Sequence, residues 1–430
     1  MALTPLRIAM VSLHSSPLGE LGTRDTGGMS VYVRELAGEL GRRGHRVDVF
    51  TRRPHGPHPG APRVRPMGPN ARLVHLDAAQ GEQHDGKLGL YPSLPRFLES
   101  LESFRRGEGG RYDLVHTHYW LSGCLGAGAA LRWGVPHVVM FHTWGAAKNR
   151  AGCGEDEPAL RLAAERELAS SCHRVVAPTA RERDELVGAG AAPPDRVAVI
   201  PCGVDLERFR PLDRVACRRS RGLGGAGPVL LYVGRFAPVK GAGRLLEALA
   251  RLGPRPGLRL LLVGGDGPAS PEARALEERA RALGLAGSVW FRGRVDQGLM
   301  PSLYAVADLL VVPSHYESFG LATLEALACG TPVASTRVGV APDVLDPRVN
   351  GAFLDPDPAA MAAGLDGAVD RALAGAWPRD RVRASVAAYC WPRVADAVEQ
   401  LYEDVLAEAG GKAVRPAKAT SGPRAAGGSG

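Results

Sequence analysis

The chain has no long apolar run. Gly, Pro or a charged residue interrupts every apolar stretch of the 430 residues, well before the ~18 residues that a bilayer-spanning helix requires. The first apolar segment contains Arg7 and is followed by no small-residue cleavage site, so we expect a buried first strand there and not a secretory signal peptide. An integral membrane protein is therefore not expected.

Paired cysteines and metal-ligand spacings are also missing. The cysteines are odd in number and form no C-x-x-C pair, which argues against a disulfide framework or a zinc site and is typical of a reducing compartment. The "HTH" stretch that begins at His116 has no third ligand at a useful spacing. We therefore expect a cytoplasmic protein without a zinc site. The seven cysteines are Cys124, Cys153, Cys172, Cys202, Cys217, Cys329 and Cys390.

A dense basic run is absent from the body of the chain, although the net charge is +8. Lys412, Arg415, Lys418 and Arg424 carry half of that excess within a C-terminal stretch that contains no acidic residue. Charge alone is not a specific signal for nucleic-acid binding, so no nucleic-acid partner is expected. The segment 409–430 is rich in Gly, Ala, Ser and Pro, a composition that predicts a disordered tail.

Apolar segments alternate with helical patterns along the rest of the chain. The stretch "RIAMVSLH" is a continuous apolar run, typical of a strand buried on both faces of a parallel sheet. Val33, Leu36 and Leu40 recur at helical spacing after Gly28, and "RVDVFTR" follows as the next strand, which completes a βαβ unit. Further strands are expected at "YDLVHTH", "HVVMFHT", "RVVAPT" and "RVAVIP", and then at "VLLYVGR", "RLLLVGG", "SVWFRG", "DLLVVPS" and "PVASTRV".

This alternation predicts an α/β fold with two Rossmann-like, doubly wound domains that face each other across a cleft. The stretch from Asp205 to Pro228 is rich in Arg and Gly and is interpreted as a linker. We expect a first domain over residues 1–205, a second over 206–390, and a helix over 391–408 that crosses back to the first domain. Ligands of such folds collect at the carboxyl ends of the parallel strands, so the cleft is the expected binding site.

Two short motifs resemble binding sites but fit structural roles better. The stretch "GLGGAG", from Gly222, matches the dinucleotide pattern, but it precedes a strand, whereas a dinucleotide turn follows a strand and opens a helix. The stretch "DPD" at Asp355 is followed by Pro358, which favours a turn before a helix over a metal site.

The strongest signal is "PSHYESFGLATLEALACGTPV". It predicts Glu317 in a loop after a strand and Glu325 on a helix that begins near Gly320, and five helical residues rise about 7–8 Å. The backbone N–H groups of Ser318, Phe319 and Gly320 lie between the two carboxylates, at a helix N-terminus that suits an anion. Carboxylates on both sides of an anion site describe a nucleotide-sugar pocket, with the sugar at Glu317 and the ribose at Glu325. The alternative is a surface loop beside a solvated helical Glu.

A second signal is the stretch "GRFAPVKG". Arg235 ends a strand and Lys240 is expected to open the following helix, where a cation opposes the helix dipole. Two cations at this place suit an anion that the dipole also attracts. An ordinary solvated Lys is the alternative interpretation.

Gly27 and Gly28 stand side by side before the first expected helix, at the carboxyl end of the first strand. Glycine permits a positive φ and a close approach to the backbone. We therefore expect this backbone to contact the diphosphate or the sugar of the donor. The alternative is a plain helix-entry turn.

These motifs and four longer sequence stretches resemble those of glycosyltransferase family 4. Members of this family are retaining enzymes of the GT-B fold that use nucleotide sugars. The four stretches are "HSSPLGELGTRDTGGMSVYV", "YDLVHTHYWLSG", "FHTWGAAKN" and "YESFGLATLEALACGTPV", and the resemblance covers roughly residues 6–405. Within the family, the chain is most similar to the D-inositol-3-phosphate N-acetylglucosaminyltransferases of mycothiol synthesis and to sucrose-phosphate synthases.

The resemblance implies a role for several residues. Arg235 and Lys240 would neutralise the leaving diphosphate. Glu317 would hold the hydroxyls of the donor sugar, Glu325 the ribose, and His142 would contact the donor sugar. The first domain would bind the acceptor and the second the nucleotide sugar, with UDP as the expected nucleotide. The resemblance implies no metal and no cofactor, since the nucleotide sugar is a substrate. It implies no enzyme nucleophile either, because the acceptor would attack on the face that the nucleotide leaves.

Lys87, Tyr119, Thr143 and Arg161 lie where the inositol-phosphate enzymes of the family hold the phosphate of the acceptor. Two cations and two hydroxyl groups also suit a dianion on chemical grounds. We therefore expect a small phosphorylated acceptor, a polyol or a sugar, with inositol phosphate as the first to try. The alternative is that Lys87 and Arg161 are merely solvated.

The chain departs from the inositol-phosphate enzymes at two places. They have Asn where this chain has Ser30, and Leu-Ala-Ala-Val where it has the four residues from Trp144 to Ala147. Both places lie at the expected cleft, so a sucrose-phosphate-synthase-like acceptor stays open. A nucleotide-sugar epimerase of the same fold would lack the family's E-x7-E element, which is here Glu317 to Glu325. A non-enzymatic nucleotide-binding protein would not need His142 and Glu317. A homodimer is compatible with the sequence.

Overall fold

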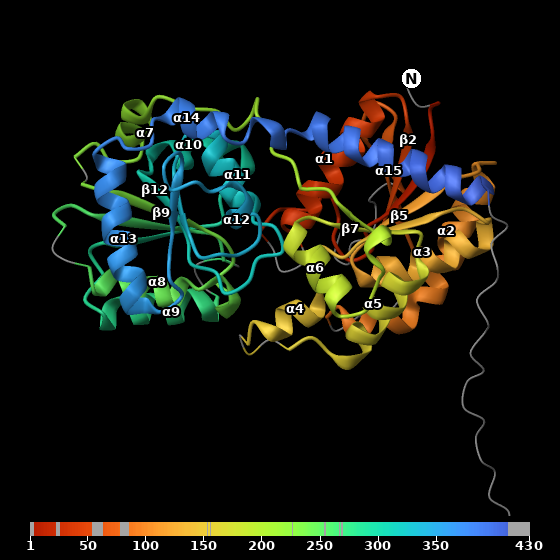
Figure 1. The fold of residues 1–430 in the computed structure, drawn as a ribbon, viewed down its shortest axis with the longest axis horizontal. Coiled ribbons are helices and arrows are strands. Elements are labelled where there is room, and N and C mark those ends of the chain that lie inside the picture. Colours follow the sequence, from red (N-terminus) through yellow and green to blue (C-terminus); the bar gives the residue numbers. More distant parts are fainter. Residues whose placement is uncertain are drawn as a thin grey trace, which may run out of the picture.

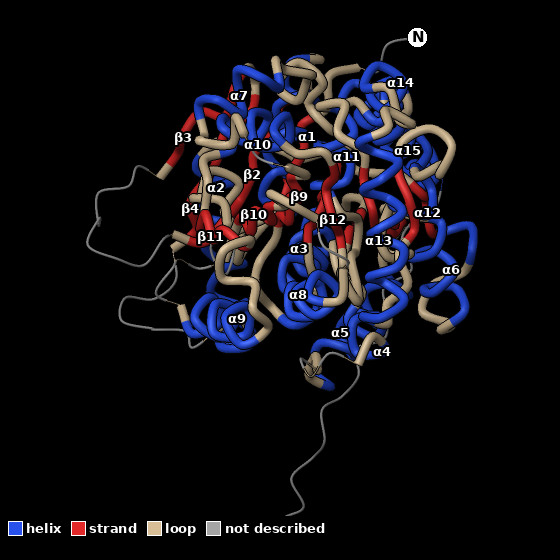
Figure 2. The backbone as a smooth tube through the Cα atoms, turned by 90° about the vertical axis from the view of Figure 1, so that its left-hand side faces the viewer, coloured by secondary structure: helices blue, strands red, loops and turns tan. Residues whose placement is uncertain are grey.

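The computed structural model describes residues 4–22, 26–53, 63–77, 86–152, 154, 156–225, 227–252, 255–265, 267 and 270–411. Two α/β domains lie side by side along the long axis of the molecule, each built on its own sheet (Figure 1). Viewed along that axis, the strands form a central layer with helices above and below it (Figure 2). The predicted α/β fold of two Rossmann-like, doubly wound domains is confirmed.

The first sheet has eight strands in the order β3-β4-β2-β1-β5-β6-β7-β8. All neighbouring pairs are parallel except β3 and β4. The side chains from Ile8 to Val11 are fully buried in β1, as expected for a parallel strand covered on both faces. The strands are β1 (Arg7–Val11), β2 (Arg46–Arg52), β3 (Val64–Gly68), β4 (Ala71–Leu76), β5 (Leu114–His118), β6 (His137–Met140), β7 (Arg174–Ala177) and β8 (Val197–Val199). The helices are α1 (Gly28–Arg42), α2 (Leu94–Gly107), α3 (Trp120–Trp133), α4 (Gly145–Arg150), α5 (Ala159–Ser171) and α6 (Ala180–Gly188), with the 3-10 helices η1 (Leu88–Ser93) and η2 (Pro194–Arg196).

The second sheet has six parallel strands in the order β11-β10-β9-β12-β13-β14. Its strands are β9 (Val229–Val233), β10 (Arg259–Val263), β11 (Val289–Gly293), β12 (Leu309–Val312), β13 (Val333–Ser335) and β14 (Gly351–Phe353). The remaining helices are α7 (Arg214–Ser220), α8 (Ala242–Ala250), α9 (Pro271–Ala282), α10 (Met300–Val306), α11 (Leu321–Ala328), α12 (Ala341–Val344), α13 (Pro358–Leu373), α14 (Arg379–Ala384) and α15 (Trp391–Gly411), with the 3-10 helices η3 (Pro238–Lys240), η4 (Gln297–Leu299) and η5 (Ala387–Tyr389).

Three strands were not predicted from the sequence. The antiparallel pair of β3 and β4 turns at Asn70, whose φ is +53°. β3 lies at the edge of the sheet and contains Pro66, which is tolerated at an edge because no neighbour needs its missing N–H. β14 has three residues, too few to show a periodic pattern.

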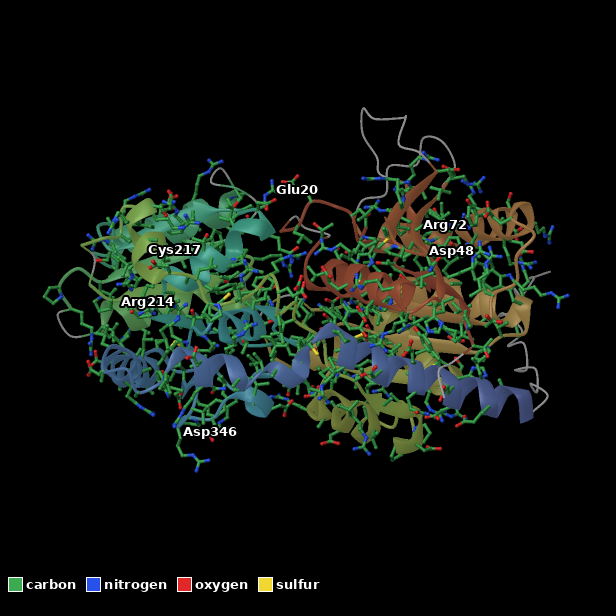
Figure 3. All side chains as sticks on the ribbon, turned by 90° about the horizontal axis from the view of Figure 1, so that it is seen from above. Glu20, Asp48, Arg72, Arg214, Cys217 and Asp346 are labelled. Atoms are coloured by element: carbon green, nitrogen blue, oxygen red, sulfur yellow. The ribbon has the colours of Figure 1, made fainter. Side chains whose placement is uncertain are left out.

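The Arg-rich stretch that was interpreted as a linker contains a helix, α7, which packs against α10. The reason is a buried carboxylate. Asp308 accepts hydrogen bonds from Arg214 Nη1 at 2.9 Å, from Arg218 Nη2 at 2.6 Å and from the Val229 N–H at 2.8 Å. Figure 3 labels Arg214 and Cys217, which lie on this helix. The arginines thus fasten α7 to the second domain.

The two motifs that resembled a dinucleotide site and a metal site, "GLGGAG" and "DPD", have structural roles. Asp357 caps the N-terminus of α13, where its carboxylate accepts from the N–H groups of Ala359 and Ala360. The "GLGGAG" stretch precedes β9, as expected, and Gly222 has a φ of +69° in a turn.

The final helix, α15, crosses from the second domain and packs along α1 of the first (Figure 1). Glu399 of α15 pairs with Arg43 at 2.6 Å and with His45 at 2.9 Å. The buried Tyr402 hydroxyl lies 2.7 Å from His116 Nδ1, and the Trp391 ring contacts the Tyr32 ring. Residues 412–430, which make up most of the predicted disordered tail, lie outside the described residues.

We expect Asp308→Ala to lower the free energy of unfolding by about 3 kcal/mol, because it leaves two arginines and a buried N–H without their acceptor. Chemical denaturation followed by circular dichroism measures this loss. Asp184→Ala is the matched control, since its side chain is 75% exposed and lies 4.0 Å from Arg183. An equal loss in both variants would contradict an anchoring role for Asp308.

Candidate active site

A cleft of about 440 Å³ lies between the two domains. It opens at the carboxyl ends of β1, β5 and β6 on one side and of β9 and β12 on the other, where ligands of doubly wound folds bind. Every site residue predicted from the sequence lines this cleft, apart from Arg161. These residues are Gly27, Gly28, Lys87, Tyr119, His142, Thr143, Arg235, Lys240, Glu317, Ser318, Phe319, Gly320 and Glu325.

The Glu317 carboxylate is held from two sides. Lys240 Nζ donates to Oε2 at 2.7 Å, and Ser314 Oγ donates to Oε1 at 2.8 Å. Lys240 does not open α8, as the sequence analysis expected, but ends η3 two residues earlier. Gly241 follows with a φ of +72°, and a Cβ at this position would lie 2.1 Å from the Pro313 carbonyl oxygen. Only glycine therefore lets this turn pack against the end of β12.

Glu325 lies on α11, and its half-buried carboxylate accepts a 2.6 Å hydrogen bond from the Tyr304 hydroxyl. Burial raises the pKa of Glu325, and the Tyr304 bond opposes that rise. The predicted start of this helix is confirmed, because Gly320 is its N-cap residue, with a φ of +96°. The two glutamates thus lie on either side of a helix N-terminus, as predicted.

Three backbone donors lie between these glutamates. Within the described part of the chain, no oxygen accepts a hydrogen bond from the N–H groups of Ser318, Phe319 or Gly320. The loop packs closely on Gly339, where a Cβ would lie 2.1 Å from the Phe319 carbonyl oxygen, and the Val340 N–H donates to that oxygen at 2.7 Å. A helix N-terminus with free donors is suited to bind an anion.

Arg235 follows β9 and reaches the cleft with an exposed side chain. Its guanidinium has no hydrogen bond or ion pair to any residue that the structure describes. Arg235 and Lys240 therefore place two cations on the same wall as the free N–H groups.

The glycine pair does not use the positive φ that glycine permits. Gly27 has a φ of −171° and caps α1, and neither glycine has a positive φ. A Cβ on Gly27 would meet no atom within 4 Å, whereas one on Gly28 would lie 3.4 Å from the Leu321 side chain of α11. Because neither residue has a side chain, the backbone of Gly27 and Gly28 itself lines the cleft between the two domains.

Tyr119 and His142 stand at the ends of the neighbouring strands β5 and β6, and both have a positive φ, +77° and +58°. Lys87 Nζ lies 5.4 Å from the centre of the Tyr119 ring. Thr143 follows His142 and donates from Oγ1 to its carbonyl. The structure therefore brings Lys87, Tyr119 and Thr143 together on the first-domain wall.

Arg161 lies one layer behind this wall, with 2% of its side chain exposed. It is not a solvated surface residue. Its guanidinium bonds the Tyr119 hydroxyl at 2.9 Å and the Thr143 carbonyl at 2.6 Å, and it pairs with Glu157 and Glu165 at 2.7 Å each. Arg161 thus positions two wall residues and does not itself reach the cleft surface.

Two residues of the site were missed. His14 lines the cleft, its ring lies 4.3 Å from the Tyr119 ring, and its enclosed Nδ1 has no partner among the described residues. Glu182 accepts from Ser318 Oγ at 3.2 Å across the domain boundary, and burial raises its pKa to about 8. His14 follows the first strand, and that position could have identified it. Glu182 follows Thr179 in a T-x-x-E pattern, which indicates only a helix cap.

No group of three metal-ligating side chains was found in the described part of the chain. Nor does any helix among these residues have both the length and the apolarity needed to cross a membrane.

Two family models match the chain, one in each domain. Glycosyltransferase Family 4 matches residues 26–208, and Glycosyl transferases group 1 matches residues 214–377. The D-inositol 3-phosphate glycosyltransferase of Geodermatophilus obscurus is 40% identical over 98% of this chain and 96% of its own length. The D-inositol 3-phosphate glycosyltransferase 2 of Catenulispora acidiphila is 42% identical over 85% of this chain and 87% of its own length.

A solved structure agrees with these relatives. The sucrose-phosphate synthase of Thermosynechococcus elongatus superposes with a TM-score of 0.84 at 31% identity, over 94% of this chain and all of the other. Anabaena HepE in complex with UDP-glucose has a TM-score of 0.72 at 19% identity and shows the shared fold only. The chain therefore belongs to glycosyltransferase family 4 and is a glycosyltransferase of the GT-B fold.

Proposed function

We propose that the protein is a retaining glycosyltransferase that moves a sugar from a UDP-linked donor to a hydroxyl of a small phosphorylated polyol, with inositol phosphate as the first candidate. The observation that carries the proposal is the arrangement around the start of α11. Three free N–H groups lie between Glu317 and Glu325, and two cations stand on the same wall. This set of groups matches the charges and hydroxyls of a nucleotide sugar.

In this proposal the diphosphate lies against the N–H groups of residues 318–320. Arg235 and Lys240 neutralise the charge that develops on it as the bond to the sugar breaks. Glu325 accepts from the ribose, and Glu317 accepts from the hydroxyls of the transferred sugar. Lys240 holds Glu317 at 2.7 Å, so the group that binds the sugar and the group that binds the phosphate are positioned together.

The transfer itself breaks the bond between the anomeric carbon and the phosphate oxygen and forms one to the acceptor oxygen. The acceptor attacks on the face that the diphosphate leaves, and its proton passes to the departing phosphate oxygen, so the anomeric configuration is retained. The nucleoside diphosphate is then the leaving product. No residue of the chain needs to form a covalent intermediate, and the protein contributes orientation and charge.

The first-domain wall is the proposed acceptor site. Lys87, Tyr119 and Thr143 face the cleft there, and Arg161 fixes the last two from behind. A cation beside two hydroxyl groups suits a phosphate. The relatives in Geodermatophilus and Catenulispora carry names that specify an inositol phosphate acceptor, which supports this choice.

A sugar phosphate is the second candidate acceptor. The superposition with the sucrose-phosphate synthase favours it, and so does Ser30. Its hydroxyl is fully buried and lies 2.7 Å from Ser15 Oγ, so it does not project into the cleft as a longer Asn could. The protein is expected to act without a cofactor in either case.

The direct test is a screen of nucleotide sugars for nucleotide release, with acceptors offered in phosphorylated and unphosphorylated form. We expect removal of the acceptor phosphate to lower kcat/KM by far more than tenfold, because its charge-assisted contacts with Lys87, Tyr119 and Thr143 would be lost. Lys87→Ala should erase most of that preference. Equal turnover of both acceptor forms would contradict the phosphate site and leave only the general transferase function.

We expect Arg235→Ala and Lys240→Ala each to lower kcat by about 10²–10³, the usual effect of removing one well-placed group that stabilises developing charge. Steady-state kinetics with the best donor measures this. Arg251→Ala is the control, because Arg251 is also exposed on the second domain but does not line the cleft. Near-normal kcat in either cleft variant would refute its role at the leaving group.

Glu325→Gln should mainly raise the donor KM and leave kcat within a few-fold. The ribose contact is the same in the bound donor and in the transition state, so its loss weakens binding without slowing the chemical step. Isothermal titration with UDP measures the same loss without turnover. An unchanged KM and an unchanged affinity for UDP would rule out the ribose role.

A further inference from the structure

His142 is one of the few described residues other than Gly that have a positive φ. Its φ of +58° is in the left-handed region, which is uncommon outside Gly and strained. The residue lies two positions beyond the end of β6 and lines the cleft. Such a conformation persists where the surroundings hold it, so the contacts of the His142 ring decide what it offers to a ligand.

The ring of His142 is held by two neighbours. Its Nε2 lies 2.9 Å from Nδ1 of His118, the last residue of β5. The Tyr32 ring of α1 packs edge-on against it at 5.1 Å. The other nitrogen, Nδ1, is neither enclosed nor bonded to any residue within the described ranges. Nδ1 is therefore the nitrogen of His142 that a ligand in the cleft can reach.

Both imidazoles are neutral at pH 7. Burial lowers the pKa of His142 to about 3 and holds that of His118 well below its ordinary value. A neutral imidazole carries one N–H and one bare nitrogen. In the bond between His118 and His142, one ring must therefore donate and the other accept.

The second nitrogen of His118 decides between these two arrangements. Its Nε2 is fully buried and has no partner in the described part of the chain. A proton on that atom would be a buried donor without an acceptor, which is rarer in proteins than an acceptor without a donor. The proton of His118 therefore belongs on Nδ1, which donates to His142 Nε2, and the proton of His142 must then lie on its Nδ1.

We propose that His118 is a positioning residue that fixes His142 in the Nδ1–H tautomer, so that His142 donates a hydrogen bond to a hydroxyl oxygen of the donor sugar. The inference rests on the proposed function, because it takes the ligand of the cleft to be a nucleotide sugar. Glu317 can only accept from the sugar hydroxyls, and His142 in this tautomer can only donate to them. Together they select sugars whose hydroxyl groups stand between the two residues.

His116 supplies a matched control. It is fully buried on the same strand as His118, and its Nδ1 lies 2.7 Å from the Tyr402 hydroxyl of α15. Its ring lies 4.5 Å from that of His118 but makes no hydrogen bond to His142. Replacement of His116 should therefore disturb the same core without changing the tautomer of His142.

The first test is independent of activity. Nitrogen NMR of histidine-labelled protein without substrate reports which ring nitrogen carries the proton, and His142→Leu identifies the His142 signals by difference. We expect the proton on Nδ1 in the wild type and in His116→Leu, and a shift toward Nε2 in His118→Leu. A wild-type proton on Nε2 of His142 would overturn the proposal.

The second test is kinetic. We expect His118→Leu to lower kcat/KM for the donor by about 10- to 100-fold, the scale of a misplaced contact at a reacting substrate. His118→Asn should recover most of this loss, because its amide keeps a donor near the position of Nδ1. In the His142→Leu background, His118→Leu should cost nothing more, since it acts through His142.

The outcomes separate the two proposals. Wild-type kinetics in His118→Leu, or losses that multiply in the double variant, would overturn the positioning role. If no nucleotide sugar supports transfer, the proposed function fails, while the NMR result still decides the tautomer.

Discussion

The packing of α1 against α15 is the constraint on which the rest of the molecule depends. Arg43, near the C-terminal end of α1, pairs with Glu399 of α15, and Tyr32 in its middle packs against Trp391. At its other end α1 opens onto the cleft, and Arg34 Nη2 donates to Gln297 of the second domain at 2.7 Å. One helix therefore contacts α15, the cleft and the second domain.

Most charged side chains at the cleft already have a hydrogen-bond or ion-pair partner within the protein. Lys240 and Glu317 neutralise each other, and the Glu325 carboxylate is held by Tyr304. Arg161 behind the opposite wall is paired with two carboxylates. Because these groups are already oriented, a ligand does not have to order them on binding. Arg235 is exposed and makes no side-chain hydrogen bond or ion pair to any residue that the structure describes.

The parallel strands and the start of α11 could be predicted because their signals are local: apolar runs, a Gly N-cap, and two glutamates at fixed spacing. What depends on distant contacts could not be predicted. Asp308 binds the arginines of α7, in the stretch interpreted as a linker. Arg161 is buried because it pairs with Glu165 on α5 and with Glu157 just before that helix. The positive φ of His142 is likewise not visible in the residue type.

The crossing of α15 has a consequence for the order of synthesis. The last strand of the first sheet ends at Val199, yet the helix that covers α1 begins at Trp391, about 190 residues later. A ribosome adding about 5–20 residues per second needs roughly 10–40 s to make that interval. During this time the apolar face around Tyr32 lacks its cover, although its own domain has already emerged. The domain that is made first is thus completed last, only when α15 has been made.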